Sequence, residues 1–489
     1  MKTLLKSYCL LLVAVSISFT LSAQTPKLNS YPSATAVIYL DFDGHNVGGT
    51  SWNFFGSFDC GPSGLNPAQI NEVFDRVAED YRPFNINVTT DSTVFLAAPI
   101  GKRMRVVLTI SSSWYGSAGG VAFVGSFLWS DDSPCFVFTA LHGYNVKNIS
   151  EAAAHEAGHT LGLYHQSKYD AMCNKVSDYD PGVGSGEIGW APIMGVGYYR
   201  NFTLWNNGPN TFGCNNNQSD LDIITSAANG FGYRTDDHSS TFTGATIPVF
   251  SNHEFNVAGV VEKNTDQDLF KFIMPSDGQF QLEASPYNVG AGNSGSDLDM
   301  QVTLYDQTQT PLSVYNPGTL LNSVADTSLN AGTYYIKVEG KGNLYASSYA
   351  SLGSYSLLAR IDGGGTILPL HKLELLAAQN NNTHQLNWNI IADEQIVGQW
   401  LEVSKDGSSF SPLTEASKDV RDYSYRPAQT NSSYQYRLRV EFADGKRYYS
   451  NTVSLKAGSV AKPKLISNLL TSNTVSVSSP GHFFTALLI

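Results

Sequence analysis

The chain has 489 residues, of which 42% are hydrophobic and 15% are charged, and its formal net charge is −12. This length favours about three domains, because a single hydrophobic core seldom organises more than about 250 residues. The acidic balance excludes nucleic acid as an expected partner, since its binding needs a basic surface, and the many Gly and Tyr residues are typical of β-rich extracellular modules.

Residues 1–23 have the pattern of a secretory signal peptide. Lys2 and Lys6 form a positively charged start, an apolar stretch follows, and Leu21-Ser22-Ala23 supplies small residues for cleavage before Gln24. A membrane anchor is the alternative, but no later stretch is long and apolar enough to span a bilayer. We therefore expect a secreted, extracellular protein without an integral membrane segment.

Four cysteines remain once Cys9 has left with the signal peptide, namely Cys60, Cys135, Cys173 and Cys214. In an oxidising compartment they allow three pairings. All four precede residue 215, so disulfides would stabilise the N-terminal domain alone. The pair Cys173 and Cys214 is favoured, because it would bracket the segment that follows a histidine cluster.

Residues 24–236 alternate strand and helix patterns. An amphipathic helix is predicted over residues 67–81, where Ile70, Val73, Phe74 and Val77 share one face. Strands are predicted over residues 37–40, 85–89, 103–110, 121–127 and 135–140. A helix that carries the histidine cluster is predicted after the last of these strands.

From residue 237 onwards the helical periodicity disappears. Residues 237–362 contain runs that alternate at period two, such as Leu298-Met300-Val302-Leu304, and these runs predict an all-β sandwich. A linker is predicted over residues 363–367, which include three consecutive glycines. A second all-β module is predicted over residues 368–456, and residues 457–489 form a further linker and a short tail.

The sequence HEAGHTLGLYH, from His155 to His165, holds three of the ten histidines of the chain. On a helix, His155 and His159 share one face, and Gly162 can end the helix and turn the chain so that His165 reaches the same point. Three neutral imidazoles and one water form the tetrahedral arrangement of a catalytic zinc ion with an open position. The Glu156 carboxylate can reach that water without being a ligand.

Two structural alternatives compete with this interpretation. One is a histidine-rich surface helix, and the other is a purely structural metal site, which leaves Glu156 without a role. Asn148, three residues before Glu151, resembles a capping box and is the predicted start of the helix.

The eleven residues resemble the HExxHxxGxxH zinc signature of the metzincin metallopeptidases at all five fixed positions. The resemblance implies an α+β catalytic domain with a mixed sheet and an active-site helix, in which His155, His159 and His165 ligate one Zn²⁺. Glu156 would be the general base. The implied function is a secreted endopeptidase that hydrolyses extracellular proteins or peptides, held along an edge strand formed by residues 119–127. An ordinary interior strand is the competing interpretation of these residues.

Metzincins also carry a methionine turn beneath the metal, and Met194 and Met172 are the two candidates here. Met194 is favoured, because its glycine-rich surroundings suit a tight turn. Some metzincins have a metal-proximal tyrosine two residues after this methionine, but Val196 occupies that position. Tyr198 is therefore the candidate for stabilising the oxyanion.

The regions after residue 236 resemble modules of secreted proteins. Residues 237–362 are similar to the bacterial pre-peptidase C-terminal (PPC) module in NTDQDLFKF, AGTYYIKVEG and GSYSL. Residues 368–456 resemble a fibronectin-III-like sandwich in LNWNI, LEVSKDGSSF and YQYRLRVEFADG. These modules would bind substrate or act as spacers. The alternative function of the chain is thus a catalytically weak or inactive surface-binding or adhesive protein, in which Glu156 would have no use.

The tail KPKLISNLLTSNTVSVSSPGHFF is similar to the beginning of a type IX secretion sorting domain, but it lacks the later strands of such a domain. This resemblance implies an interaction with export machinery and a location at the cell surface of a Gram-negative bacterium.

Two further acidic motifs have competing interpretations. Asp266, Asp268, Asp297 and Asp299 form two Asp-x-Asp pairs that would suit Ca²⁺, although turn carboxylates are common without an ion. VIYLDFDG, at residues 37–44, looks like the nucleophile strand of haloacid-dehalogenase-type phosphatases. His45 departs from that pattern, so a structural role for the carboxylates at the strand end is favoured.

Overall fold

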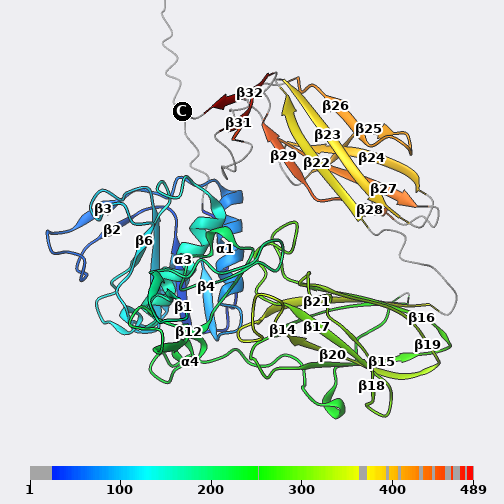
Figure 1. Cartoon of the computed structure of the whole chain (residues 1–489), viewed down its shortest axis with the longest axis horizontal. Coiled ribbons are helices and arrows are strands. Elements are labelled where there is room, and N and C mark those ends of the chain that lie inside the picture. The colour runs from blue at the N-terminus through cyan, green and yellow to red at the C-terminus, as the bar shows by residue number, and fades with distance from the viewer. Residues whose placement is uncertain are drawn as a thin grey trace, which may run out of the picture. The chain divides into compact units, whose positions relative to one another are not determined.

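The structure is a computed structural model that describes residues 25–251, 253–362, 372–380, 382–392, 396–405, 409–428, 433–442, 447–456, 464–465, 474–479 and 482–487. The predicted signal peptide and the linker at residues 363–367 lie outside these residues. The chain divides after Ile361 into two compact units, which are described separately (Figure 1). Among the described residues, no helix has the length and apolar character needed to cross a membrane.

The N-terminal region, residues 25–236, is built on a five-stranded sheet of order β4-β1-β5-β7-β6. Four strands are parallel, and the edge strand β6 is antiparallel to β7, so the sheet is mixed. Its strands are β1 (Ala36–Asp41), β4 (Ile86–Thr89), β5 (Arg103–Thr109), β6 (Gly120–Val121) and β7 (Cys135–Phe138).

Both faces of this sheet are covered. On one face, Ile38, Val106 and Val137 join the hydrophobic cluster that includes residues of α1 (Pro67–Asp80) and α3 (Val146–Thr160). On the other face, Val37 packs in a separate small cluster with α2 (Ser92–Ala97). Every residue of β1 is buried, so the sequence from Ala36 to Leu40 is hydrophobic without alternation before the strand ends at Asp41.

Helix α1 follows its sequence signals closely. Asn66 caps it and forms a capping box with Gln69, Pro67 occupies the first turn, and Ile70 and Val73 are buried on its inner face. At its end, the buried Tyr81 hydroxyl donates to the Ala154 carbonyl of α3 at 3.0 Å. This contact fixes the two helices against each other.

One expectation for local structure in this region was wrong. Only Gly120–Val121 of the predicted strand over residues 119–127 is a strand, and a 3-10 helix, η1 (Ser126–Leu128), follows it.

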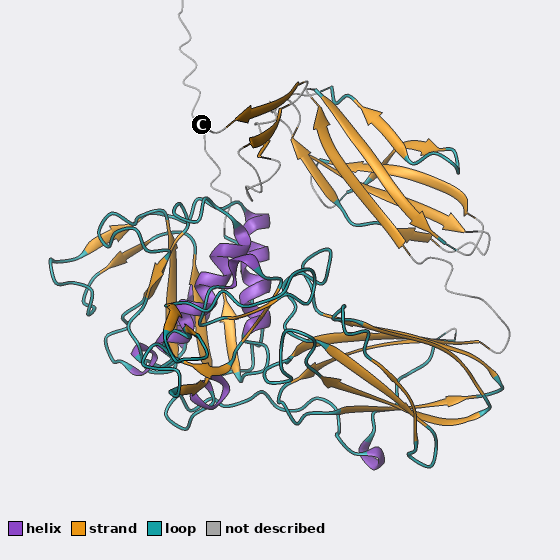
Figure 2. Cartoon of the chain, viewed as in Figure 1, coloured by secondary structure: helices purple, strands orange, loops and turns teal. Residues whose placement is uncertain are grey.

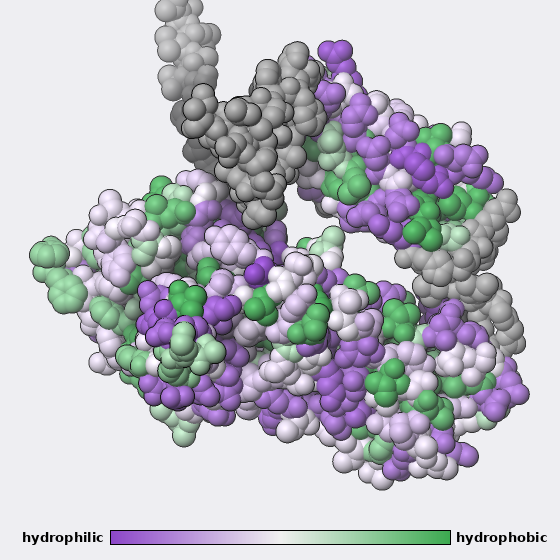
Figure 3. Space-filling view, viewed as in Figure 1, coloured by the Kyte–Doolittle hydropathy of each residue, from purple (hydrophilic) through white to green (hydrophobic). Residues whose placement is uncertain are grey.

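Between β1 and α1 the chain forms a hairpin of β2 (His45–Val47) and β3 (Phe58–Cys60). Phe54 and Phe55 lie exposed in the loop of this hairpin, whose tip is apolar on the face shown in Figure 3.

After α3 the N-terminal region continues in short elements. Two-stranded ladders join β8 with β9, β10 with β11 and β12 with β13. The bounds are β8 (Lys168–Tyr169), β9 (Lys175–Ser177), β10 (Trp190–Pro192), the 3-10 helix η2 (Gly197–Tyr199), β11 (Phe202–Leu204), β12 (Asn207–Pro209), β13 (Asn217–Ser219) and α4 (Asp220–Ile224). Figure 2 shows that nearly all helix among the described residues belongs to the N-terminal region.

The first β-sandwich, residues 237–362, consists of two four-stranded sheets of order β14-β21-β16-β19 and β15-β20-β17-β18. The elements are the 3-10 helix η3 (Phe242–Gly244), β14 (Glu254–Val261), β15 (Asp268–Met274), β16 (Gly278–Pro286), β17 (Met300–Tyr305), β18 (Pro311–Tyr315), β19 (Ser323–Leu329), β20 (Gly332–Gly340) and β21 (Gly353–Asp362). Their inward-facing residues alternate with outward-facing ones, which is the period-two pattern of the sequence.

The N-terminal region and the first β-sandwich share one hydrophobic cluster rather than having separate cores. Polar contacts reinforce their junction. The buried Glu79 carboxylate accepts from the Ser354 backbone N–H at 2.6 Å, and the Leu221 N–H donates to the Tyr349 hydroxyl oxygen at 2.9 Å. The two regions therefore form one compact unit across the boundary expected at residue 236.

The second unit contains the second β-sandwich, residues 372–456, with a hydrophobic core of its own. One sheet has the order β22-β23-β26, and the other has the order β25-β24-β27-β28 with β29 also paired to β27. The bounds are β22 (Lys372–Asn380), β23 (Thr383–Ile391), β24 (Ile396–Ser404), β25 (Ser411–Ala416), β26 (Asp422–Tyr425), β27 (Ser433–Phe442), β28 (Arg447–Tyr449) and β29 (Val453–Lys456). The tail adds an antiparallel ladder of β30 (Lys464–Leu465), β31 (Thr474–Ser479) and β32 (His482–Leu487).

Candidate metal centre

Helix α3 positions the first half of the histidine cluster. Its N-cap is Asn145, whose side-chain oxygen accepts from the Asn148 N–H at 3.0 Å, so the helix begins three residues before the predicted start. The shift has a simple cause: Asn148 lies in the first turn, where its N–H needs an acceptor and Asn145 supplies one. His155, Glu156 and His159 then fall within the last two turns and are all buried.

A tight turn at Gly162 brings the third histidine back towards the helix. Gly162 has φ +107°, a left-handed conformation that glycine adopts without strain. The Gly162 N–H donates to the His159 carbonyl at 2.9 Å, and the Leu163 N–H donates to the Gly158 carbonyl at 3.2 Å. These bonds close the helix end, as the sequence predicts, and they let His165 face His155 and His159.

The three imidazoles lie together. One ring nitrogen from each of His155, His159 and His165 lies within 4.8 Å of the other two, and the ring centroids are 4.6–5.2 Å apart. Nδ1 of His155 donates to the Ile193 carbonyl at 2.8 Å, and Nδ1 of His159 donates to the Leu163 carbonyl at 2.7 Å. These bonds leave Nε2 of both rings free for a metal, and metal-binding histidines usually donate their other ring N–H to a carbonyl or carboxylate in this way.

The local electrostatics favour neutral imidazoles. Burial is the main cause that lowers the pKa of all three rings, to about 4 for His159 and well below the ordinary value for His155. The neighbouring imidazoles add to this effect for His155 and His159. A neutral imidazole is the form that binds a metal, so the donor set fits a zinc ion without competition from protons near neutral pH.

The side chain of Glu156, a residue of α3, lies between this helix and the edge strand β6. Burial raises the pKa of its carboxyl group to about 8 in the metal-free chain, and a cation nearby would lower it again. A Cβ atom at Gly120 would lie 2.6 Å from Glu156 Oε1 and 2.8 Å from the Phe136 carbonyl oxygen. Only glycine therefore fits where β6 passes directly over this carboxylate.

Strand β6 is the edge of the five-stranded sheet on the side of the histidines. The Phe138 N–H donates to the Gly119 carbonyl at 2.9 Å, which extends the pairing with β7 by one bond. The sequence alone left the choice between an edge and an interior strand open. The structure places the strand at the edge and makes it shorter than expected.

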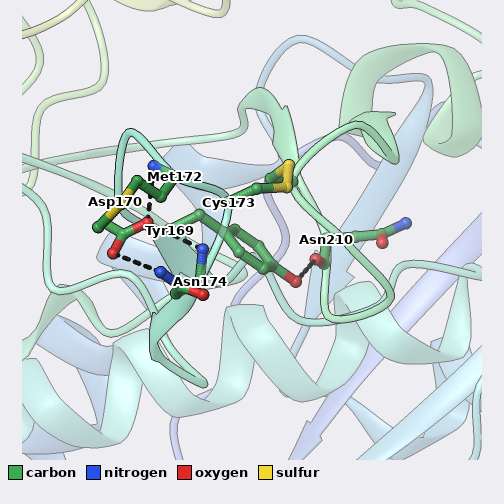
Figure 4. Close-up of a disulfide and its surroundings, with 7 residues drawn as sticks. Tyr169, Asp170, Met172, Cys173, Asn174 and Asn210 are labelled. Atoms are coloured by element: carbon green, nitrogen blue, oxygen red, sulfur yellow. Dashed lines mark hydrogen bonds between the residues drawn. A yellow bond between two sulfur atoms is a disulfide. The ribbon is translucent and has the colours of Figure 1, made fainter.

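The two candidate methionines have opposite environments. Met194 is fully buried, and its Sδ lies 2.8 Å from the position that a Cβ of Gly158 would take, beneath the helix between His155 and His159. Met172 is 80% exposed, in a turn where Asp170 accepts from the N–H groups of Met172 and Asn174 (Figure 4).

A cavity of about 260 Å³ opens beside the histidines. The predicted residue Tyr198 lines it, with its ring 5.5 Å from that of His142. Tyr179, which sequence reasoning missed, also lines it, and its ring centroid is 4.4 Å from that of His165. Tyr179 lies in an irregular segment, where no periodicity indicates that it returns to the cluster. Other lining residues are Gly119, Gly120, Glu151, Ile193, Val196 and Gly197.

The cysteines form one disulfide among the described residues. Cys173 is bonded to Cys214, the favoured pair, while Cys60 and Cys135 are buried free thiols. Near the disulfide, the Tyr169 hydroxyl donates to the Asn210 carbonyl at 2.8 Å (Figure 4). The disulfide and this bond hold together the two loops that follow His165.

The acidic motifs separate in the structure. Asp41 forms an ion pair with Arg105. Asp266 and Asp268 gather with Asp236 in one group of carboxylates. Asp299 lies elsewhere and accepts from the Asn343 side chain at 2.8 Å, and Asp297 is buried against Asp80, so the second Asp-x-Asp pair does not join the first.

The chain was compared with curated proteins, solved structures and protein families. No curated protein matches the chain. Among solved structures, pectate lyase PelI from Erwinia chrysanthemi is 14% identical over 17% of this chain and 28% of the lyase, with a TM-score of 0.16. This chain thus corresponds to less than a third of the lyase.

Two solved modules are covered almost completely. The pre-peptidase C-terminal domain of collagenase from Bacillus anthracis is 14% identical over 26% of this chain and 100% of that domain, with a TM-score of 0.19. The sixth fibronectin type III domain of a human fibronectin type III domain containing protein is 14% identical over 21% of this chain and 98% of that domain, also with a TM-score of 0.19. At these TM-scores the likenesses support no conclusion about this chain.

The family comparison covers the histidine helix and the segment before it. Residues 77–166 match the model of metallo-peptidase family M12B, Reprolysin-like, a segment that ends one residue after His165. This match and the converging imidazoles support a zinc metallopeptidase domain in the N-terminal region.

Proposed function

We propose that the chain is an exported zinc-dependent endopeptidase that hydrolyses peptide bonds of extracellular proteins. The observation that carries the proposal is the convergence of three neutral imidazoles beside a buried glutamate, directly under the edge strand of the sheet. The Reprolysin-like match over the same helix supports it.

His155, His159 and His165 would hold the zinc ion. When bound, zinc would polarise the scissile carbonyl group and lower the pKa of a water towards about 7. The Glu156 carboxylate would accept a proton from the attacking water and then donate it to the leaving amine. Its burial suits this role, because a dry site strengthens its interactions with a developing charge.

The edge strand would orient the substrate. An extended peptide could pair with β6, since the far side of this strand faces no further strand in the sheet order. Gly119 and Gly120 keep this edge free of side chains above Glu156, so the scissile carbonyl could approach closely. The cavity lined by Val196, Gly197 and Tyr198 would take a substrate side chain beside the scissile bond.

Two further roles belong to the proposal. Met194 would form the apolar floor of the site beneath Gly158, where its contact with the helix would keep the histidines in register. Tyr198 would donate to the developing oxyanion, and Tyr179 is placed to share or replace that role, since its ring lies beside His165.

Export and attachment would use the ends of the chain. The signal-peptide pattern of residues 1–23 and the disulfide between Cys173 and Cys214 support a secreted protein. The second β-sandwich would act as a fibronectin-III-like module, and the tail would engage a type IX export machinery. The first β-sandwich would correspond to a PPC-like module.

The test is proteolysis of unfolded casein by the purified full chain, beside a Glu156→Gln variant and a zinc-chelated sample. We expect the variant to keep its zinc, measured by metal analysis, and to lose about 10²–10⁴-fold in the rate of cleavage. Glu72→Gln is the matched control, because Glu72 lies on α1, pairs with Arg76 and is remote from the histidines in the sequence. It should cleave like the native chain.

Two results would contradict the proposal. If Glu156→Gln cleaves casein at the native rate, Glu156 is not the general base. If the chain binds no zinc, the three histidines do not form a zinc site. A zinc-loaded native chain that cuts none of a panel of unfolded proteins would instead favour the surface-binding alternative.

A further inference from the structure

Five acidic side chains meet where the N-terminal region joins the first β-sandwich. We call Asp236, Asp237, Glu262, Asp266 and Asp268 the junction acid cluster. Carboxylate oxygens of Asp236, Asp237 and Glu262 lie within 4.8 Å of one another, and so do those of Asp236, Asp266 and Asp268. The two groups share Asp236, and Asp237, Asp266 and Asp268 all act electrostatically on Glu262, so the five residues lie close together.

Three oxygen atoms of the innermost carboxylates in this cluster have no hydrogen-bond donor. Glu262 is 1% exposed, and neither of its carboxylate oxygens has a hydrogen-bond partner. Asp268 is fully buried, and its Oδ1 has none, while its Oδ2 accepts from the Tyr355 hydroxyl. Unpaired buried carboxylates cost several kcal/mol, so three such oxygens in one place require a compensating charge.

The protein supplies little of that charge. Backbone N–H groups reach the outer oxygens: Val260 donates to Asp237, and Glu262 donates to Asp266. Among the described residues, Arg234 and His238 are the basic side chains that act on Asp237, which lies at the exposed side of the cluster. Burial, with the neighbouring carboxylates as a further cause, raises the pKa of Glu262 to about 10 and that of Asp268 to about 9. The inner acids therefore need a shared proton or a bound cation.

We infer that the junction acid cluster is a calcium site. All of its ligand atoms are carboxylate oxygens, the donors that Ca²⁺ prefers and that Zn²⁺ shares with nitrogen or sulfur. Two oxygens bound to one Ca²⁺ at about 2.4 Å lie no more than about 4.8 Å apart, and the carboxylate oxygens within each of the two groups satisfy this limit. Mg²⁺ fits less well, because it keeps several waters and seldom takes an all-protein set of ligands.

The position of the site indicates what the ion would do. Asp236 ends the N-terminal region and Asp237 follows it, Glu262 follows β14, and Asp268 begins β15. One ion would thus tie the connecting segment to two strands of opposite sheets of the first β-sandwich. This is a structural role at the junction, distinct from the zinc site and independent of the proposed peptidase activity.

Calcium binding to the full chain tests the inference. After treatment with chelator and return of one equivalent of zinc, the chain would be titrated with CaCl₂ by calorimetry and melted with and without Ca²⁺. We expect millimolar or tighter binding, on the order of 10⁻³ M or below, and a rise in unfolding temperature of about 5 °C in excess Ca²⁺. Mg²⁺ at the same concentration should give a clearly smaller rise.

Variants separate a calcium site from a merely buried acid. Glu262→Gln and Asp268→Asn should weaken Ca²⁺ binding at least tenfold, yet each should melt no lower than the native chain when Ca²⁺ is absent, because the amide is uncharged and has nearly the shape of the protonated carboxyl group that it replaces. Glu283→Gln is the control, since Glu283 is an exposed acid on β16 of the same sandwich. It should respond to Ca²⁺ like the native chain.

Two outcomes would overturn the inference. One is a native chain whose unfolding temperature ignores Ca²⁺ and rises on mild acidification, which would show that a shared proton serves the cluster. The other is an unchanged Ca²⁺ response in both variants, which would place the ion elsewhere. Neither readout uses casein cleavage, so failure here and failure of the peptidase proposal are distinguishable.

Discussion

The two β-sandwiches have the same kind of sequence pattern and different relations to the rest of the chain. Inward residues of the first β-sandwich, such as Phe280 and Leu357, belong to a hydrophobic cluster that also contains residues of α1 and α3. The second β-sandwich has its own cluster around Trp388 and Leu438. Period-two alternation therefore predicts a sandwich equally well in both cases and is silent about what the sandwich packs against.

The difference lies in polar contacts between regions. Glu79 and Asp80, at the end of α1, are buried against the first β-sandwich, where Ser354 of β21 donates to Glu79 and Asp297 faces Asp80. Arg76 likewise donates to the Ser294 hydroxyl at 3.0 Å. The first β-sandwich thus completes the environment of the N-terminal region, whereas the second lies in a separate compact unit.

Truncation should give the largest effect in this comparison. A mature chain that ends at Asp236 would expose the shared apolar surface and leave Glu79 without its Ser354 partner, so we expect it to be insoluble or to lose its cooperative transition. A chain that ends at Asp362 should keep the unfolding temperature and casein cleavage of the full chain within about twofold. Circular dichroism melts and cleavage rates provide the measurements.

If the shorter chain melts cooperatively and cleaves casein, the shared cluster is dispensable. The first β-sandwich would then be as independent as the second.

Core substitutions should give an intermediate effect that depends on the region. Phe280→Ala and Trp388→Ala each remove a buried aromatic ring, and each should cost its own unit about 3–5 kcal/mol. Phe280→Ala should lower the temperature at which casein cleavage is lost, because its cluster includes the active-site helix. Trp388→Ala should lower only a separate transition. The measurements are calorimetric scans of both variants and their casein cleavage after heating. If both variants lose activity equally on heating, the two sandwiches do not differ in their coupling to the active-site helix.

The smallest effect concerns pH at the junction. Burial is the main cause that raises the pKa values of Asp80 and Asp297 well above the ordinary range. The two carboxyl groups face each other, and Glu79, Glu151 and Lys147 are the other charged groups that act on them. An acid whose pKa is raised on folding stabilises the native state while it is protonated, and this contribution is lost as pH rises towards its folded pKa. The difference in free energy of unfolding between Asp297→Asn and the native chain should therefore shift in favour of the variant by at least about 1 kcal/mol from pH 5 to pH 9.

The measurement is urea unfolding of both chains at the two pH values. A difference between native and variant that does not change with pH would show that the pair does not titrate. Asp326→Asn, an exposed position on β19 of the same sandwich, should show no such trend.

Local sequence was sufficient wherever the structure depends on residues close in the chain. The spacing of His155 and His159 on a helix, followed by glycine at a left-handed position, was enough to bring His165 to the same point, because helix geometry and one turn leave few alternatives. The sandwiches followed from alternation for the same reason. The catalytic roles of Glu156 and Tyr198 stay predictions until they are measured.

Tertiary structure decided what depends on residues far apart in the chain. It buried Met194 and exposed Met172, brought Tyr179 to His165, and shortened the edge strand to Gly120–Val121. It also separated the two Asp-x-Asp pairs, merged the cores of two regions and gathered the junction acid cluster. No local pattern encodes these contacts, because packing between distant segments, rather than the preference of any single residue, determines which buried groups face one another.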